Sequence, residues 1–256
     1  MSSNTVEDTE RYGQIETGQR MLAVIETLAM EGGAGVTTVA DRVDIAKSTA
    51  HAHLQTLHEQ RYVAKRDEKY YVGLRFLKVG QDAKRPWDEH EFIKQKVEAL
   101  AEETQLRAQF LIAEHGEAVY VYRSTGRHSV PTDSRVGVRM PLHSTGAGKA
   151  ILAFWPDELV DEVIDRHGLE KLTDETIDSR TELNHELKQI RDQGYALNDG
   201  ESWAGVQAIG APVTTPDGDV LGGLSVSGSA HRFKPEDVTD LVMGAANEIE
   251  LNLRYE

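Results

Sequence analysis

The chain has 256 residues, of which 39% are hydrophobic, and this is enough for one or two globular domains. It contains no run of about 18 apolar residues that would form a membrane span. It also contains no cysteine, which excludes disulfides, cysteine-based zinc sites and thiol nucleophiles. The net charge of −15 at first argues against a nucleic-acid partner, because phosphates repel an acidic surface.

The charge is unevenly distributed along the chain. Residues 18–85 carry 11 Lys and Arg against 8 Asp and Glu, whereas residues 86–256 carry 16 against 31. This asymmetry suggests a nucleic-acid-binding module joined to a second domain. Residues 1–17 lack the apolar stretch of a signal peptide and are expected to form a flexible acidic tail. We expect a cytoplasmic protein. The excess of acidic residues is typical of a halophile, and an ordinary acidic bacterial protein is the alternative.

The first elements are three short helices. Apolar spacing predicts a helix over residues 19–30, which glycines at 32, 33 and 35 would end. A second helix would begin near Thr37 or Thr38, either of which could cap it, and would end at a tight turn at Asp44. A third helix would begin at Ser48 or Thr49 and run to about residue 60.

A hairpin follows these helices. Strand-favouring residues at 62–64 and 70–72 flank the polar turn 65–68. Three helices and a hairpin with basic residues at its tip are typical of a winged helix-turn-helix, whose third helix enters the major groove. A helical subdomain that binds a protein partner is the alternative. The predicted DNA-binding residues are Thr37, Thr38, Lys47, Ser48, Thr49, His51, His53, Gln55, Lys65, Arg66 and Lys69.

The two histidines of the third helix have a second interpretation. The inclusion of His53 depends on the phase of the helix, and either His51 or His53 could be an ordinary helical histidine.

Residues 81–91 are polar, contain Pro86, and are expected to form a partly helical linker. The rest of the chain mixes helices with strands, which indicates an α+β domain over residues 92–256. The hairpin turn Pro216–Asp219 would join two central strands, and Gly194 would end a helix. The predicted helices cover residues 92–103, 158–165, 182–193 and 235–253, and the predicted strands cover 108–113, 118–122, 136–140, 206–213 and 220–226.

The segment from His143 to Leu152 is rich in glycine but is not a P-loop. That motif needs glycine at position 143 and Ser or Thr at position 150, where the chain has His143 and Ala150. It is better explained as a glycine-rich turn that enters a helix, whose free N–H groups favour an anion such as a carboxylate. A turn that needs glycine only for its geometry is equally well supported.

Other polar residues give no catalytic or metal-binding pattern. Asp199, Glu201, His185 and His231 match no metal motif, so no metal, cofactor or catalytic residue is predicted. Ser225 and Ser227 alternate on a strand and therefore share one face, which could bind a polar ligand or face solvent.

Several segments resemble the IclR family of regulators. Residues 46–57 (AKSTAHAHLQTL) and 72–76 (VGLRF) are similar to its DNA-binding domain, although Ala52 stands where the family often has arginine. Residues 141–150 (PLHSTGAGKA), 194–196, 211–213 and 224–228 are similar to its effector domain. The resemblance spans about residues 18–253. It implies a winged helix-turn-helix over residues 18–80, joined through a linker helix to a GAF-like domain that binds small organic molecules, often carboxylates.

The resemblance also implies pocket residues and an oligomer. Gly146 and Ala147 would offer backbone N–H groups, and Ser225 and Ser227 would offer hydroxyls. Val206 would form an apolar wall, and Asn198 and Ala208 stand where the family often has Asp and Cys. A homodimer or a dimer of dimers is implied.

The predicted function is therefore a DNA-binding transcriptional regulator of catabolic genes. A small organic acid or sugar-derived effector would modulate its binding to a pseudopalindromic operator. The alternatives are an enzyme that processes a small acid, for which no nucleophile with a base is evident, and a winged-helix protein-interaction module.

Overall fold

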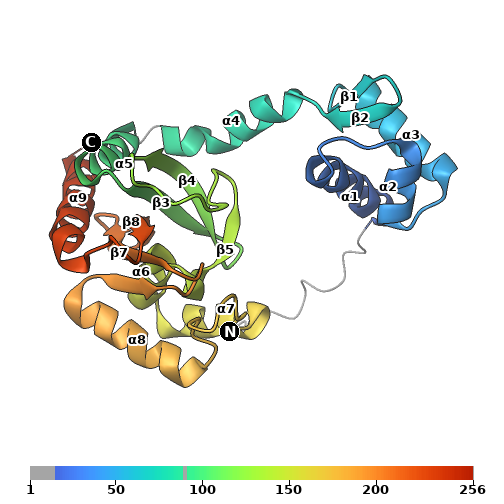
Figure 1. Cartoon of the computed structure of the whole chain (residues 1–256). Helices are drawn as coiled ribbons and strands as arrows, with labels where there is room; N and C mark the ends of the chain where they lie inside the picture. The colour runs from blue at the N-terminus through green and yellow to red at the C-terminus, as the bar shows by residue number, and fades with distance from the viewer. Residues whose placement is uncertain (1–14, 89–90, 256) are drawn as a thin grey trace, which may run out of the picture. The chain divides into compact units, whose positions relative to one another are not determined.

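The computed structural model describes residues 15–88 and 91–255, with side chains at all of these except 86–88 (Figure 1). Most of the predicted acidic tail, residues 1–14, lies outside the described residues. Helix α1 begins at Glu16, inside the segment expected to be tail. The chain divides into two compact units, Met1–Arg85 and Pro86–Glu256, and this boundary falls within the predicted linker.

The N-terminal unit contains three helices and a hairpin, in the predicted order. Its helices are α1 (Glu16–Met30), α2 (Val36–Val43) and α3 (Lys47–Glu59). Strand β1 (Val63–Arg66) pairs antiparallel with β2 (Lys69–Val72). One apolar core holds these elements together, because burying such side chains is the main favourable term in folding. Its fully or almost fully buried members are Val24, Leu28, Ala34, Val39, Ala40, Ala50, Leu54, Leu57, Val63 and Tyr70.

The helix starts differ from the predicted ones. Helix α2 begins after Gly35, so neither Thr37 nor Thr38 caps it. Helix α3 begins at Lys47 after an extended Ala46, and no side chain accepts its first N–H groups. The tight turn between these helices is confirmed, because Asp44 lies in the left-handed region with φ 54°.

Helix α4 (Arg75–Asp88) follows the hairpin and includes much of the predicted linker. Its first half carries apolar side chains that are largely exposed, namely Leu77 at 64% and Val79 at 44%, and Leu74 just before the helix is 81% exposed. The expectation of a partly helical segment is therefore confirmed as far as Asp88.

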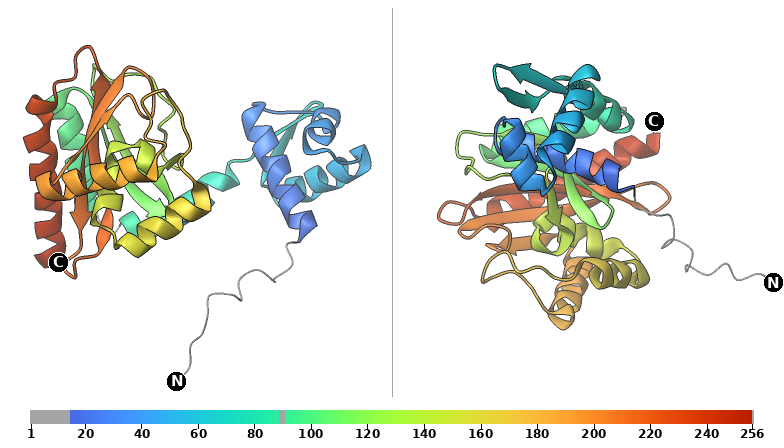
Figure 2. Two further views of the ribbon diagram at one scale, coloured as in Figure 1. Left: turned by 90° about the horizontal axis from the view of Figure 1, so that it is seen from below. Right: turned by 90° about the vertical axis from the view of Figure 1, so that its right-hand side faces the viewer.

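The C-terminal unit is built on one antiparallel sheet with strand order β5-β4-β3-β8-β7-β6. Helices cover both of its faces (Figures 1 and 2), so the domain is α+β as predicted. The strands are β3 (Arg107–Glu114), β4 (Glu117–Thr125), β5 (Arg139–Pro141), β6 (Ala196–Asp199), β7 (Val206–Thr214) and β8 (Val220–Ser229).

The two faces of the sheet have separate apolar cores. Helices α5 (Glu91–Thr104) and α9 (Pro235–Tyr255) pack on one face. Helices α6 (Gly146–Phe154), α7 (Asp157–His167) and α8 (Arg180–Gln193) pack on the other. Successive side chains of a strand point to opposite faces. Ala108, Phe110 and Ile112 of β3 therefore enter the α5–α9 core, while Leu111 enters the core under α6.

Most predicted elements of this unit are confirmed within a few residues. Gly194 ends α8 in a left-handed conformation, φ 84°. The strand expected at 136–140 is shorter and forms only over 139–141. Strand β6 was missed because it has four residues, two of them polar, and carries little strand signal.

Among the described residues, no helix is both long and apolar enough to cross a membrane. The described part of the chain also contains no cluster of three or more His, Asp or Glu side chains placed to hold a metal ion.

Candidate DNA-recognition helix and effector pocket

Helix α3 presents a polar face to solvent. Lys47, Ser48, His51 and Gln55 are exposed, and Thr49 is partly exposed. The opposite face is buried through Ala50, Leu54 and Leu57. Five of the predicted contacts are therefore accessible on one helix. The Gln55 amide donates to Glu59 Oε1 at 2.9 Å, which holds that side chain along the helix.

His53 was predicted as a DNA contact, and the structure contradicts this prediction. Its side chain is only 7% exposed and lies on the buried stripe of α3. The helix phase explains this position, because residue 53 follows Ala50 by three and precedes Leu57 by four, so all three share one face. His53 therefore belongs to the core of the N-terminal unit.

The hairpin presents its basic residues on both strands. Lys65 and Arg66 lie on β1, Lys69 lies on β2, and all three are exposed. The turn itself consists of Asp67 and Glu68, so the basic residues flank the tip. Among the described residues none of the three cations forms an ion pair, and the described part of the chain pairs no acid with Lys47 either. These charges are therefore available to phosphates.

Two aromatic rings support the hairpin cations. Lys65 Nζ lies 5.4 Å from the centroid of Tyr70, and the Arg66 guanidinium lies 5.3 Å from that of Tyr71. Thr37 and Thr38 are exposed on α2, the helix that precedes the recognition helix. All the predicted DNA-binding side chains except His53 are thus at least partly exposed in this unit.

The C-terminal unit contains a cavity between the sheet and the start of α6. Its enclosed volume is only about 20 Å³, well below the about 300–1,000 Å³ of typical small-molecule sites, so a ligand of more than a few atoms would have to displace the side chains around it. The cavity does have the few convergent polar groups of such sites. Six of the seven predicted effector residues line this cavity: Gly146, Asn198, Val206, Ala208, Ser225 and Ser227.

Ala147, the seventh, does not line the cavity. It is 1% exposed and packs against the sheet. A Cβ at Gly210 would overlap with the backbone of Gly146 and Ala147, and one at Gly223 would lie 2.6 Å from Ala147 O. Helix α6 therefore approaches the strands closely at two glycines, and the backbone of Ala147 lies against β7 and β8.

The expected helix start is confirmed at Gly146. Thr145 caps α6, because its hydroxyl accepts from Gly148 N at 2.9 Å. Gly146 lines the cavity, so the first turn of the helix lies at the pocket.

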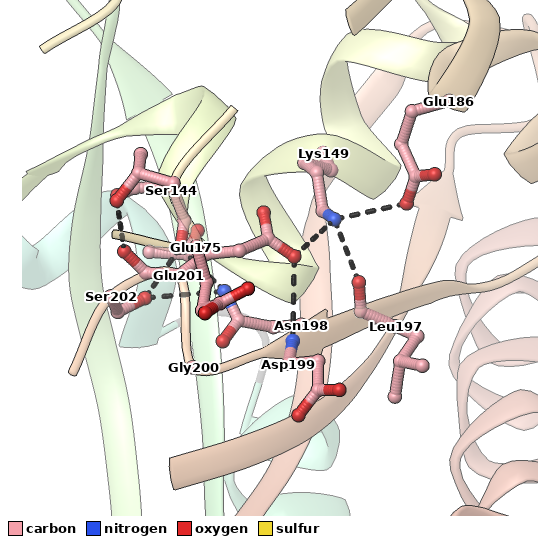
Figure 3. Close-up of polar contacts among 12 residues, drawn as sticks. Ser144, Lys149, Glu175, Glu186, Leu197, Asn198, Asp199, Gly200, Glu201 and Ser202 are labelled. Carbon is pink, nitrogen blue, oxygen red and sulfur yellow. Dashed lines mark hydrogen bonds and ion pairs between the residues drawn. The ribbon is translucent and has the colours of Figure 1, made fainter. Parts of the chain in front are cut away.

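Asn198 has a defined orientation in the pocket wall (Figure 3). Its Nδ2 donates to Ser144 O at 2.5 Å and to Ser202 Oγ at 3.3 Å. Ser202 Oγ also donates to Ser144 O. Both side-chain hydrogen bonds of Asn198 use its nitrogen, and its Oδ1 is the atom left to accept from a ligand hydroxyl.

The β6–β7 loop (residues 200–205) forms one side of the cavity through Ser202 and Trp203. An ion pair beside the loop anchors it. Lys149 Nζ, from α6, contacts Glu201 Oε1 at 2.7 Å, Glu186 Oε1 at 3.0 Å and Leu197 O at 2.7 Å (Figure 3).

Burial gives this cluster unusual electrostatics. Lys149 is 1% exposed and Glu201 is 6% exposed. Burial raises the pKa of Glu201 above its ordinary value, and the charge of Lys149 opposes this shift. The ammonium of Lys149 is held inside the domain, so it serves the fold and is not presented to a phosphate, in agreement with the exclusion of a P-loop.

Sequence reasoning missed several lining residues. These include Gln109 and Leu111 on β3, Tyr120 on β4, and Trp203 in the loop. No motif identifies them, because only the pairing of distant strands brings them together. Burial raises the pKa of Tyr120 well above its usual value, so its phenol stays neutral and can donate or accept.

His143 lies elsewhere. It is 4% exposed, its Nε2 is 3.1 Å from Glu170 O, and it lines a different cavity with His167 and Gly168. Burial is the main cause that lowers the pKa of His143. The structure therefore does not bring His143 to the pocket with Ser225 and Ser227.

Comparisons with known proteins identify both domains. The IclR helix-turn-helix domain matches residues 19–67, and the bacterial transcriptional regulator IclR C-terminal domain matches residues 88–251. A Halobacterium salinarum protein named "Probable HTH-type transcriptional regulator ArcR" is 32% identical over 242 residues, which cover 90% of each chain.

Solved structures share the fold. The IclR protein of Thermotoga maritima is 26% identical with a TM-score of 0.76, covering 93% of this chain and 96% of its own. An IclR homologue from Microbacterium hydrocarbonoxydans, complexed with 4-hydroxybenzoate, is 21% identical with a TM-score of 0.82 and covers 94% of this chain and 100% of its own. The relatives that match are named as regulators of transcription. The chain, with its helix-turn-helix and its C-terminal effector-type domain, belongs to the IclR family of transcriptional regulators.

Proposed function

We propose that this regulator binds a pseudopalindromic operator and that a small organic acid or sugar-derived effector alters that binding. The observation that carries the proposal is the cavity at the start of α6, which is lined by six of the residues that the family resemblance implied. Polar groups from β6, β8 and α6 converge there, with Val206 and Leu111 as apolar walls. This composition suits a small ligand with one polar end.

The class of effector follows from these groups. Asn198 Oδ1 accepts from a hydroxyl, and the serine hydroxyls can donate to a carboxylate. The 4-hydroxybenzoate bound to one homologue carries both a hydroxyl and a carboxylate. Control of genes that degrade such compounds would fit an effector of this class, and we propose catabolic genes as the targets.

Operator binding by a homodimer or a dimer of dimers would follow from symmetry. Two copies of the winged helix would read two half-sites, since protein two-fold symmetry is mirrored in the DNA. The exposed Leu74, Leu77 and Val79 around the start of α4 support self-association, because large apolar side chains clustered at the surface mark interaction sites. The effector would change operator affinity only to the extent that it binds one arrangement of the two winged helices more tightly than another.

We also propose that the protein acts in a cytoplasm rich in salt. Its net charge of −15 and its similarity to a Halobacterium salinarum relative support this setting. Salt weakens phosphate contacts, so base and shape contacts of α3 would supply more of the affinity there.

A mobility-shift experiment on the DNA upstream of the gene tests the proposal. The full chain is titrated at a potassium chloride concentration matching its cytoplasm, alone and with a panel of hydroxybenzoates, sugar acids and keto acids. We expect a specific shift that at least one compound changes.

Two results would contradict the proposal. Turnover of a panel compound, lost on substitution of Ser225 or Ser227, would favour an enzyme. Absence of specific DNA binding, or a shallow salt dependence of binding, would favour a protein-interaction module.

A further inference from the structure

Arg107, the first residue of β3, is a buried cation without a carboxylate partner. It is 2% exposed, the only hydrogen bond of its side chain among the described residues is to the Thr132 hydroxyl, and its Nε has no partner. The charged side chain with the largest effect on the pKa of Arg107 is Arg123, which is also positive. Burial, followed by the charge of Arg123, lowers the pKa of Arg107 from its ordinary value. A buried charge is costly unless it is paired, so an anion would be strongly favoured here.

Gln109, two residues along β3, carries another donor that has no partner. It is 4% exposed, it lines the effector pocket, and its Nε2 has no hydrogen-bond partner. Residues two apart on a strand point to the same face. The side chains of Arg107 and Gln109 therefore leave the sheet on the side where the pocket lies.

Strand register places both residues beside the predicted serines. Arg107 pairs with Ser227 and Gln109 pairs with Ser225 across β3 and β8. Directly opposed residues in an antiparallel pair have Cβ atoms about 4.5–5.5 Å apart on one face. Arg107, Gln109, Ser225 and Ser227 thus form one patch of donors, here called the β3–β8 patch.

The charge surrounding this patch differs from that of the neighbouring cavity. No Asp or Glu lines the effector pocket. A second cavity, which Glu201 itself lines, is instead rich in carboxylates. Its acidic lining residues are Glu175, Glu182, Glu186, Asp199 and Glu201. In an acidic domain, the effector pocket therefore has an unsatisfied donor in Gln109 and no competing carboxylate. Arg107 is not one of its lining residues, but it pairs with the lining residue Ser227.

We propose that the β3–β8 patch is the anion subsite of the effector pocket, in which Arg107 and Gln109 bind the carboxylate of a small hydroxy-carboxylate. This inference rests on the proposed function and deepens it. The hydroxyl of the same ligand donates to Asn198 Oδ1, whose Nδ2 is already engaged. The carboxylate binds at β3 and β8, and not at the backbone of Ala147, which does not line the cavity.

The test measures how strongly the full chain prefers an acid over its neutral amide. Thermal unfolding is followed at constant ionic strength in potassium chloride with acetate or acetamide, and with 4-hydroxybenzoate or 4-hydroxybenzamide. Acetate probes the subsite alone, because it is the smaller of the two acids and carries only the carboxylate and a methyl group. We expect saturable stabilisation by the acids, with an affinity about 10- to 100-fold above that of the amides, as for hydrogen bonds to a charged group.

Variants assign this preference to particular side chains. Arg107→Met should abolish the acid preference, and Arg107→Lys should retain part of it because lysine keeps the charge but lacks the planar fork. Gln109→Leu should lower it several-fold. Arg123→Met is the matched control, because it removes an adjacent exposed arginine, and it should leave the preference within about twofold. If Arg107→Met does not fold, Arg107→Lys and Gln109→Leu still decide the matter.

The outcomes separate this inference from the proposed function. No saturable carboxylate effect on the wild type, or an unchanged acid preference in both Arg107→Lys and Gln109→Leu, would overturn the subsite. If these variants lose the acid preference while no compound changes operator binding, the subsite stands and the regulatory proposal fails. If a compound changes operator binding equally well in Arg107→Lys and Gln109→Leu, the regulatory proposal stands and the subsite fails.

Discussion

Replacing Lys149 with methionine should strongly destabilise the C-terminal unit. The change keeps most of the side-chain volume but removes the ammonium that contacts Glu201 Oε1 and Glu186 Oε1. It leaves the Glu201 carboxylate buried, and the Oε2 atom of that group already lacks a partner. Removing one member of a buried ion pair costs about 3–5 kcal/mol, because the remaining charge is uncompensated.

This cost corresponds to a large fall in melting temperature. For a domain of this size 1 kcal/mol is worth roughly 2–4 °C, so Lys149→Met should lower Tm by roughly 6–20 °C. Glu186→Gln is the matched control, because Glu186 is 26% exposed and Lys149 keeps Glu201. That variant should lose at most about 1 kcal/mol, as for a partly exposed pair.

A double variant tests the reasoning more directly than either single change. Lys149→Met combined with Glu201→Gln leaves no buried charge in the pair, so it should recover a large part of the loss. Calorimetry or denaturant unfolding of the four proteins measures the coupling free energy. The argument would be refuted if the double variant lost as much as the sum of the two single ones, because the cost could not then be an orphaned charge.

The pH dependence of the same cluster has a definite sign. Burial raises the pKa of Glu201 in the folded state. The folded protein therefore binds the proton more tightly than the unfolded chain, and this contribution to stability is present at low pH and is lost as pH rises through the folded pKa. The difference in free energy of unfolding between the wild type and Glu201→Gln should fall with rising pH in the range above about 4.5. A difference that is flat or rises there would contradict it.

Four further substitutions test the hairpin, the recognition helix and the contact between α6 and the sheet. Lys65→Ala and Arg66→Ala should each reduce the slope of log affinity against log salt by about 1, equally for all DNA sequences, in a titration of operator binding. His53→Ala should lower the free energy of unfolding by about 1–3 kcal/mol and leave base preference unchanged; a changed preference with intact stability would put His53 at the DNA. Gly210→Ala should cost about 1–3 kcal/mol in chemical unfolding, because its Cβ overlaps with Gly146, and unchanged stability would show that α6 can move away.

The N-terminal unit could be predicted nearly completely from the sequence. Its helices and hairpin are local structures, and glycine, apolar spacing and strand-favouring residues specify them over short stretches. The error at His53 was one of phase. With Ala50, Leu54 and Leu57 as the buried stripe, position 53 falls at the edge of that stripe. Helical periodicity alone therefore indicates that His53 lies on the buried side of the helix.

The capping residues were harder to predict. Thr37 and Thr38 have the side chains that cap helices, yet α2 begins one residue earlier and uses Gly35. A cap is a matter of one residue of register, and neighbouring candidates such as Ser48 and Thr49 cannot be separated by propensity alone.

Part of the effector pocket could be predicted from the sequence, and part is visible only in the tertiary structure. The sequence by itself determined the family, the glycine-rich start of α6, and six of the residues that line the cavity, because these could be assigned through the resemblance to the family. Only the tertiary structure decided that Arg107 and Gln109 lie opposite Ser227 and Ser225, and that Ala147 packs against the sheet outside the cavity. Strand register joins residues more than a hundred positions apart, and a shift of one residue would turn every side chain to the other face. No local pattern carries that information, since register is set by the packing of the whole sheet between its two layers of helices.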